Sequence, residues 1–554
     1  MGVWSRPGDT RGMAAEIDAR TSMIHQLRGF VLPLVFLLNA ALFGLGFLEV
    51  GFWWALVVFA PLLVLGIHDV VQSRHSILRN YPLLGHLRFL LEDMGPELHQ
   101  YMVESNTDGA PFDRDHRTLM YERAKNVEDT KPFGTEIDVY REGYAWLTQS
   151  IAPRPVVEDA SQNLRVRVGA GRAKPYDASI LNISAMSFGA LSANAVMALN
   201  RGAKRGGFAH NTGEGGFSEH HKQGGDIIWQ IGTGYFGCRQ DDGHFDAGMF
   251  QETAQDPQVK MIEIKISQGA KPGHGGILPG PKVTAEIAAA RKVKQGEDCM
   301  SPTGHSAFST PIELLEFVVR LRELCGDKPV GFKLCVGNLR EWMAIAKAMV
   351  ETGIVPDFIT VDGAEGGTGA APVEFTNHIG MPLREGLLLV HNTLVGIGVR
   401  DQLHLASSGK RVTGFDISVA MALGADWCNV ARGFMFSVGC IQSQLCHTNG
   451  CPVGVATQNK RLERALVVSD KESRVFEFHR NTVRALAEVV AACGLDHPSE
   501  LTPAHVMQRV NEFEVRSLDR IYEFFEPNQL LEGQIPPFLE RAWQTARPDS
   551  FRAA

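Results

Sequence analysis

Three cysteines within twelve positions are the most distinctive chemical feature of this sequence. Cys440, Cys446 and Cys451 form a C-x5-C-x4-C array followed by Pro452, whereas only nine cysteines occur in 554 residues. Thiolates are the usual protein ligands of iron–sulfur clusters, and ligands close in sequence allow one loop to wrap a compact cluster. Three ligands match a three-iron (3Fe-4S) cluster. The spacing therefore predicts an iron–sulfur site.

Two other interpretations of the array stay open. A tetrahedral zinc site would need His447 as a fourth ligand, and the C-x2-C spacing typical of zinc is absent. The cysteines could also be buried, inert thiols. The remaining six show no framework spacing, which favours a reducing compartment over a disulfide-stapled secreted fold. They are Cys238, Cys299, Cys325, Cys335, Cys428 and Cys493.

A repeated pattern between residues 180 and 433 must position this site. A short apolar run is followed by a glycine-rich or polar loop and, in most repeats, by a helical stretch. Eight such units predict an α/β fold, a closed (β/α)8 TIM barrel. The gap between the fourth and fifth runs, about 60 residues, must hold an insertion as well as a helix. The runs cover 180–186, 206–211, 226–231, 261–267, 330–336, 357–363, 403–409 and 427–433.

The loops after these strands should share one rim of the barrel, where barrel enzymes place their chemistry. Glycines let backbone N–H groups converge on an anion, and phosphates often bind between the last two loops. The loops therefore predict a nucleotide-like cofactor, although no G-x-G-x-x-G motif indicates a dinucleotide domain. The candidate phosphate-binding residues are Ser408, Gly409, Lys410, Arg432 and Gly433.

Lys333 lies in the middle of the fifth apolar run. Because an isolated buried ammonium is costly, this lysine must be paired or must face the barrel mouth. It could stabilise negative charge on a flavin ring, or it could form a structural pair with Glu263 or Asp362. Lys265 in the fourth run presents the same two alternatives.

Two uncharged runs near the start, at about 29–48 and 51–68, predict a two-helix transmembrane hairpin. The hairpin tip carries Glu49, and the outer flanks carry Arg20, Arg28, Arg74 and Arg79. By the positive-inside rule we expect a multi-pass cell-membrane protein whose catalytic domain is cytoplasmic. The alternative is that both runs are core helices of a soluble protein.

The sequence thus divides into four expected parts: a hairpin segment (1–75), a connecting arm (76–175), the barrel with the cysteine loop (176–500) and a C-terminal helical extension (501–554). An amphipathic pattern ending at Gly494 predicts a helix packed on the barrel. With 54 basic and 62 acidic residues the net charge is −8, and no basic tract indicates a nucleic-acid partner.

Five segments, in the same order, resemble the FMN-binding synthase portion of glutamate synthase, and together they span roughly 180 to 490. The whole chain resembles the short, membrane-anchored, stand-alone branch of that family. The matching segments are SAMSFGALS (184–192), NTGEGG (211–216), QGAKPGHGG (268–276), DGAEGGTGAAP (362–372) and GCIQSQLCHTNGCPVGVATQ (439–458).

The resemblance implies an FMN-containing barrel with a 3Fe-4S cluster bound by Cys440, Cys446 and Cys451. It implies that Lys333, Gln268 and Lys271 are catalytic. Gly213, Glu214 and Phe217 would contact the substrate. The flavin would contact Ala185, Met186, Ser187, Asn211, Gln230, Lys333, Gly366, Gly367, Thr368, Ser408, Gly409, Arg432 and Gly433.

The family reaction is reductive amination of 2-oxoglutarate to glutamate, with electrons passing through the cluster to FMN. The protein orients the reactants while the cofactor carries the redox step. No nicotinamide motif is visible, so we expect a ferredoxin or a separate reductase subunit as electron donor. The first cysteine is Cys238, so we expect no glutaminase domain and a supply of free or glutamine-derived ammonia.

Two positions depart from the family pattern. Phe217 stands where the family carries an acidic residue in the 2-oxoglutarate pocket, and His274 stands in place of a glutamate; both changes bear on substrate choice. A membrane-anchored flavoprotein acting on another amino or oxo acid, and exchanging electrons with a quinone or membrane partner, is therefore an alternative. A scaffold or sensor without turnover is a third.

Overall fold

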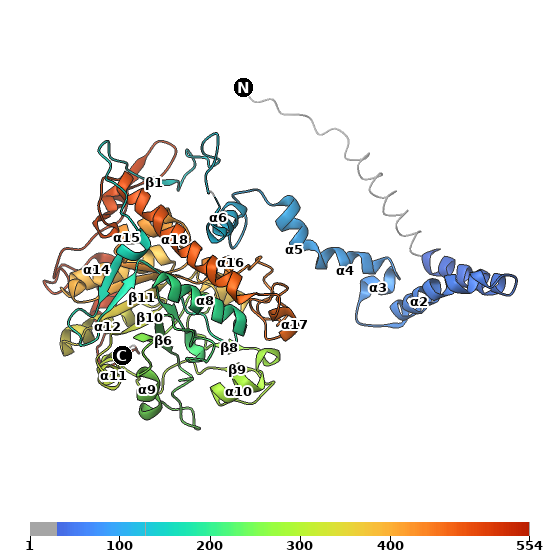
Figure 1. Cartoon of the computed structure of the whole chain (residues 1–554), viewed down its shortest axis with the longest axis horizontal. Coiled ribbons are helices and arrows are strands. Elements are labelled where there is room, and N and C mark those ends of the chain that lie inside the picture. Colours follow the sequence, from blue (N-terminus) through green and yellow to red (C-terminus); the bar gives the residue numbers. More distant parts are fainter. Residues whose placement is uncertain (1–29, 128, 553–554) are drawn as a thin grey trace. The chain divides into compact units, whose positions relative to one another are not determined.

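Eight short parallel strands close into a barrel, because their β-branched and apolar residues are buried on both faces. The computed structural model describes residues 30–127 and 129–552, and the chain divides into two units between Ser105 and Asn106. The barrel belongs to the second unit (Figure 1). Its strands are β4 (Leu181–Ile183), β5 (His210–Asn211), β6 (Ile227–Ile231), β7 (Val259–Lys265), β10 (Val330–Leu334), β11 (Phe358–Asp362), β12 (His404–Ser408) and β13 (Trp427–Val430).

The expected α/β barrel is confirmed: each of the eight apolar runs holds a strand, and β13 pairs with β4 to close the ring. The predicted run 206–211 begins before its strand. Residues 206–209 are not strand, because Gly206 ends a helix and Gly207 caps it at φ 63°. Only His210 and Asn211 remain for β5.

Helices separate most of the strands, as the repeated pattern predicts. Between β5 and β6 the described chain has only the short 3-10 helix η2 (Gly213–Gly215). The other helices that follow barrel strands are α8 (Ala193–Gly206), α9 (Ala247–Ala254), α12 (Leu339–Thr352), α13 (Val373–His378), α14 (Leu383–Gly396), α15 (Gly414–Ala422) and α16 (Arg432–Ser437).

The long connection between β7 and β10 contains the expected insertion. A two-stranded ribbon brackets a short helix and the 3-10 turn η3 (Gly280–Lys282), and a barrel helix follows. These elements are β8 (Ile277–Leu278), β9 (Cys299–Met300), α10 (Ala285–Arg291) and α11 (Pro311–Leu324).

The amino-terminal end of the barrel is closed by a hairpin of β2 (Arg165–Val168) and β3 (Tyr176–Ser179). Its apolar side chains pack with barrel residues such as Phe358 and Trp427 in one buried cluster. The opposite end, where the loops leave the strands, is therefore left for chemistry.

The longest helix of the barrel unit is α18 (Val468–Ala492), the amphipathic helix predicted before Gly494. It packs against α8, α15 and α6 (Arg114–Lys125) (Figure 1). At Gly202 of α8 the two helices approach so closely that an added Cβ would collide with Val475 of α18.

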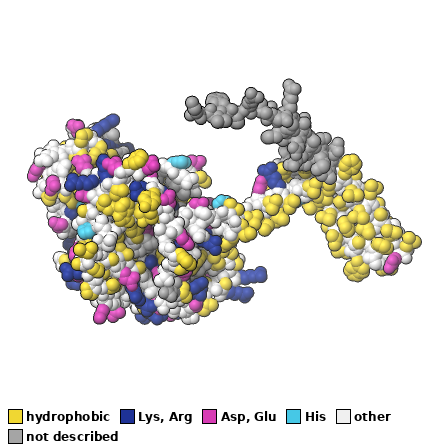
Figure 2. Space-filling model, turned by 90° about the horizontal axis from the view of Figure 1, so that it is seen from above, with side chains coloured by type: hydrophobic (Ala, Val, Ile, Leu, Met, Phe, Trp, Pro, Cys, Tyr) yellow, Lys and Arg dark blue, Asp and Glu magenta, His cyan; other side chains and the backbone are white. Residues whose placement is uncertain are grey.

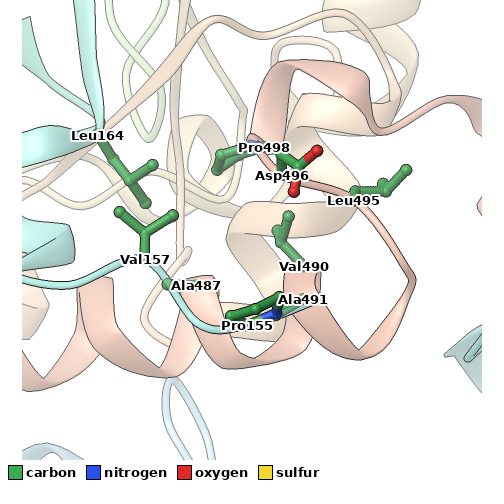
Figure 3. Close-up of a pocket in the computed structure, with 9 residues that line it drawn as sticks. All are labelled: Pro155, Val157, Leu164, Ala487, Val490, Ala491, Leu495, Asp496 and Pro498. Atoms are coloured by element: carbon green, nitrogen blue, oxygen red, sulfur yellow. The ribbon is translucent and has the colours of Figure 1, made fainter. Parts of the chain in front are cut away.

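Residues before the barrel and after α18 meet in a small antiparallel sheet of β1 (Ala145–Leu147), β14 (Val506–Arg509) and β15 (Val515–Ser517). The region 501–554, expected to be helical, thus holds strands as well as α19 (Leu518–Ile521) and α20 (Pro537–Thr545). Figure 3 shows a pocket where the arm beside α7 (Ala160–Asn163) meets the end of α18. Its lining is apolar except for Asp496.

The first unit contains an apolar helical hairpin. Helix Phe30–Gly46 and α2 (Gly51–Val71) run antiparallel. Two hydrogen bonds join them: Asn39 donates to the Phe59 carbonyl, and the Trp53 indole donates to the Gly46 carbonyl. Within the described residues, α2 alone is long and apolar enough to cross a membrane, and 11% of its apolar stretch is buried. The hairpin is as predicted; its crossing of a membrane stays a prediction. Of the flanking cations, Arg20 and Arg28 lie outside the described residues.

Four short helices follow α2 in the described part of this unit: α3 (Ser76–Asn80), α4 (Gly85–Asp93), α5 (Gly95–Leu98) and the π-helix η1 (His99–Val103). The side chains on the surface of the unit are largely hydrophobic (Figure 2).

We predict that Gly202→Leu lowers the free energy of unfolding by about 2 kcal/mol or more, because overpacking would force α8 away from α18. Thermal or denaturant unfolding of the detergent-solubilised chain measures the change. The control is Gly171→Ala, since nothing lies within 4 Å of an added Cβ there. Equal stability of Gly202→Leu and wild type would contradict the close contact.

Candidate active site

The loops that follow the barrel strands touch one another around a single mouth. Gly269, after β7, lies so close to the Gly363 carbonyl after β11 that a Cβ would collide with it. In the same way Gly276 leaves no room beside Glu214, which follows β5. Backbone can approach this closely only at glycine. The predicted gathering of glycine loops at one rim is confirmed by these contacts.

Glu263 organises the interior of the barrel beneath this rim. Its carboxylate accepts hydrogen bonds from Asn211 Nδ2 (2.8 Å), Gln230 Nε2 (2.7 Å) and Thr360 Oγ1 (2.6 Å). The side-chain oxygen of Asn211 accepts from Gly213 N at 3.0 Å. Two amides predicted to hold a cofactor are thus oriented by one buried carboxylate.

Asp362, at the end of β11, joins the β7 loop to Lys333. One of its oxygens accepts from Gly269 N (2.9 Å) and lies 3.1 Å from Lys333 Nζ. Burial lowers the pKa of Lys333, but Asp362 and Glu263 outweigh this effect, so its pKa stays above the ordinary value. The structural pair with Asp362 therefore exists. It leaves Lys333 a fixed cation in the barrel mouth, as the flavin interpretation also requires.

A second charged pair lies beside it. Lys265 Nζ is 2.8 Å from Glu214 Oε1. Burial alone would raise the pKa of Glu214. The positive charges of Lys265, Lys271 and Arg291 outweigh this effect and lower the pKa below its ordinary value, so the carboxyl stays ionised at neutral pH. Glu214, predicted to contact the substrate, is held in place by a lysine at the end of β7, two strands away from β5 in the barrel.

Lys271, in the loop after β7, is a buried cation with 3% of its surface accessible. Its Nζ donates to the Ala370 carbonyl at 3.2 Å. Among the residues that the structure describes, no carboxylate lies within ion-pair distance of it. Burial and the neighbouring Lys265 lower its pKa to about 8. A buried lysine without an ion-paired carboxylate favours an anionic ligand.

Sequence reasoning missed two neutral groups near Lys265. His305 is hydrogen-bonded to the Lys265 carbonyl (2.8 Å) and to the Tyr235 hydroxyl (3.1 Å). Burial lowers the pKa of His305 to about 4, so it is neutral at pH 7. These residues lie outside the apolar runs and glycine loops, and no spacing in the sequence indicated them. Glu263 and Asp362 had been considered only as partners of Lys333.

The predicted phosphate-side residues come from three neighbouring loops. Arg432 donates from Nη2 to the Glu365 carbonyl (2.8 Å) and lies over the ring of Phe112. Gly367 lies against this guanidinium. Burial lowers the pKa of Arg432, although Asp362 and Glu365 oppose the shift.

The rest of that set is placed as follows. Ser408 ends β12 and its hydroxyl lies 3.4 Å from that of Ser184, and Gly409 follows it beside Gly363. Gly433 begins the buried face of α16 against Phe478. Lys410, Gly366 and Thr368 are in the same loops after β12 and β11.

The predicted contacts after β4 lie next to those after β5. Met186 N donates to the Asn211 carbonyl (3.2 Å), and Ser187 packs against Gly213. Ala185 precedes them and is half-buried.

Of the positions that distinguish this chain, Phe217 is half-buried against the core near His221. His274 contacts Phe375 edge-on, with ring centres 5.3 Å apart. Gln268 is half-buried after β7, just before Gly269. Phe217 and His274 thus each lie next to an aromatic ring, and both belong to loops that follow barrel strands.

The cysteine segment is docked on these same loops. Gln458 donates to the carbonyls of Gly189 (3.1 Å) and Leu191 (2.8 Å), in the loop after β4. Asn449 donates to the Pro281 carbonyl (3.0 Å), in the insertion. Tyr121 of α6 donates to the Cys440 carbonyl at 2.5 Å. The cysteines therefore lie at the carboxyl end of the barrel.

The backbone of this segment turns in an unusual way. Gln442, Gln444 and Asn449 all have φ between 57° and 65°, a conformation that side chains other than glycine seldom adopt. Gln442 N donates to Cys440 Sγ at 3.5 Å. Left-handed residues turn successive N–H groups toward one side and form concave anion sites, iron–sulfur sites among them.

The three thiols are close enough to influence one another. Burial, then Cys446 and Cys451, raise the pKa of Cys440 to about 12, and Cys451 contributes to the raised pKa of Cys446. Within residues 30–127 and 129–552, no three His, Cys, Asp or Glu side chains converge on one metal ion. In a cluster each thiolate binds a different iron, so its ligands need not converge on one point.

Comparisons with known proteins agree with this geometry. Residues 136–496 match the family model "Conserved region in glutamate synthase". The chain belongs to the glutamate synthase family. As a member of it, the chain is an oxidoreductase acting on the CH–NH2 group of donors.

Among relatives, the glutamate synthase large subunit-like protein YerD of Bacillus subtilis is 38% identical over 499 residues, 83% of this chain and 94% of its own. The archaeal-type glutamate synthase [NADPH] of Thermotoga neapolitana is 31% identical, over 63% of this chain and 66% of its own length. Its counterpart in Methanocaldococcus jannaschii is 34% identical, over 57% and 59%. The chain therefore spans under two thirds of these two relatives.

Solved structures with a similar chain path include a mandelate oxidase with (S)-4-hydroxymandelic acid. The TM-score is 0.41 at 14% identity, over 77% of this chain and 99% of that one. Similarity at this level says nothing about ligand or reaction.

We predict that Glu263→Ala destabilises the barrel by about 3–5 kcal/mol, because it strands three buried donors and removes negative charge near Lys333. Denaturant unfolding measures the loss. Glu488→Ala, on the exposed face of α18, is the control and should change stability little. A Glu263 variant as stable as this control would show that the carboxylate does not organise the interior.

Proposed function

We propose that this protein is a glutamate synthase that reductively aminates 2-oxoglutarate to glutamate at an FMN in the barrel mouth, with a 3Fe-4S cluster on the cysteine segment. The observation that carries the proposal is the docking of that segment on the glycine loops of a barrel from this family. An external donor, a ferredoxin or a reductase subunit, would supply electrons. Ammonia would come from solution or from glutamine hydrolysed elsewhere.

The residues in the mouth suit an anionic flavin. Glycine-lined loops beside Arg432 and Lys410 offer backbone N–H groups and positive charge to a phosphate. Below them, Asn211, Gln230 and Lys333 present polar groups that Glu263 and Asp362 hold in place. FMN, when bound, supplies the hydride that reduces 2-iminoglutarate.

The chain's own residues would then position the substrate. Lys271 forms no ion pair within the described chain and offers an ammonium to a substrate carboxylate. Glu214, fixed by Lys265, offers an acceptor for the imine N–H. The neutral His305 keeps Lys265 in place without adding charge.

Turnover is the direct test. Protein purified without oxygen should form glutamate from 2-oxoglutarate and ammonia when a reduced ferredoxin or chemical donor is present. Flavin and iron are measured on the same sample, so that an inactive preparation is recognised. No glutamate from cofactor-replete protein would contradict the proposal.

Phe217 favours a second candidate, in which another 2-oxo acid replaces 2-oxoglutarate, because its ring stands where the family has an acidic residue. The same assay with a panel of oxo acids, on wild type and Phe217→Glu, separates the two. Preference of the wild type for an apolar oxo acid, reversed by the substitution, would support this candidate.

We predict that Cys446→Ser lowers the iron content by more than half while FMN is retained, because one of three cluster ligands is lost. Iron and flavin analysis of anaerobic protein measures this outcome. Cys493→Ser is the control, since Cys493 lies at the end of α18. Equal loss of iron in both variants, or in neither, would contradict the ligand assignment.

We predict that kcat/KM for 2-oxoglutarate falls as pH rises through about 8, since burial lowers the pKa of Lys271 to that value and only its protonated form attracts a carboxylate. Lys271→Arg should remove this alkaline limb, because guanidinium stays charged. Lys271→Met should lower kcat/KM at least about tenfold. Activity that rises with pH through 8 would instead point to Lys271 as a base.

We propose further that the N-terminal hairpin anchors the protein in the cell membrane, with the barrel in the cytoplasm. The apolar surface of α2 and the cations Arg74 and Arg79 support this orientation. Glu49→Cys should react with a membrane-impermeant maleimide on intact cells, whereas Ser105→Cys should react only after permeabilisation. The opposite pattern, or release of the protein by alkaline carbonate, would contradict the topology.

A further inference from the structure

Lys282, in the turn η3 after β8, is a buried cation that the proposed mechanism does not use. Its side chain is only 1% exposed. Its Nζ donates to two backbone carbonyls, that of Ala190 at 2.6 Å and that of Cys446 at 3.1 Å. It therefore bridges the loop after β4 and the cysteine segment.

No carboxylate within the described chain forms an ion pair with Lys282. Burial opposes its charge, and the groups that favour the charged form are the side chains of Cys446 and Cys451; Arg291 nearby disfavours it. An ammonium kept out of water needs a compensating anion. The anion that this place offers is the cysteine site itself.

Arg291 does not take over this role. Its guanidinium donates to the Phe188 carbonyl (3.0 Å) and lies 4.0 Å from Cys299 Sγ. Lys471 lies beside Gly439, just before Cys440, but it is paired with Asp470 at 3.0 Å. Lys282 is thus distinguished from Arg291 by its contact with a cysteine carbonyl, and from Lys471 by that contact and by the lack of an ion-paired carboxylate within the described chain.

We propose that the Lys282 ammonium is the counter-charge of the iron–sulfur cluster and raises its reduction potential. The inference rests on the proposed function, since it needs the cluster. A cluster gains one negative charge when it accepts an electron from the external donor. A cation fixed beside the cysteine segment therefore stabilises the reduced form more than the oxidised form. Because Lys282 also holds Ala190, it fixes the cluster loop to the loop on the flavin side.

The test is a redox titration of the anaerobic, full-length holoprotein, with the cluster followed by electron paramagnetic resonance. Lys282→Met removes the charge and keeps an unbranched side chain. We expect the equilibrium constant for one-electron reduction to fall about tenfold, a potential lower by about 59 mV. Lys471→Met, the matched control, should move the potential by less than a third of that, since its charge is already paired.

Each outcome is decisive. A Lys282→Met potential equal to wild type, with iron and flavin retained, overturns the proposal. If Lys282→Met keeps FMN but loses iron, the variant Lys282→Arg separates the two explanations. Wild-type iron content and potential in Lys282→Arg would support the role of the positive charge, whereas the same loss of iron as in Lys282→Met would overturn the proposal. Wild-type protein without iron would overturn both this inference and the proposed function, and is recognised before any variant is made.

Discussion

The whole arrangement depends on side chains that tie the cysteine segment to backbone carbonyls of the barrel loops. Gln458 reaches the loop after β4, Asn449 reaches the insertion after β7, and Lys282 reaches both the first loop and the segment itself. These contacts keep left-handed turns at residues other than glycine, which cost about 1 kcal/mol or more each unless the surroundings fix them. The segment is thereby preorganised beside the barrel mouth.

The side chains in the barrel mouth are held mainly by interactions between charged and polar groups. Glu263 and Asp362 hold amides and Lys333 inside the barrel, and Glu214 pairs with Lys265. Lys271 and Lys282 remain buried without carboxylate partners in the part of the chain that the structure describes. A protein keeps such charges at a cost in stability, so their anionic partners are expected to be ligands: an oxo acid or phosphate for Lys271, and a cluster for Lys282.

Much of this could be predicted from the sequence. The barrel followed from the eight apolar runs, because strands buried on both faces appear in the sequence as continuous apolar segments, and the rim followed from glycines such as Gly269. What the sequence could not give were partners distant along the chain: Glu263 with Asn211, His305 with Lys265, and Lys282 with Cys446. Such pairs depend on register and loop docking, which no local pattern encodes. The start predicted for β5, residue 206, was wrong because Gly206 is still the last residue of α8.

Iron, acid-labile sulfide and FMN in one anaerobic preparation of the unmodified chain test the central claim most directly. We predict about three iron atoms per flavin, and a paramagnetic signal in the oxidised state that disappears on reduction, as a three-thiolate cluster requires. Flavin-containing protein without iron, or with one zinc ion per chain, would contradict the account.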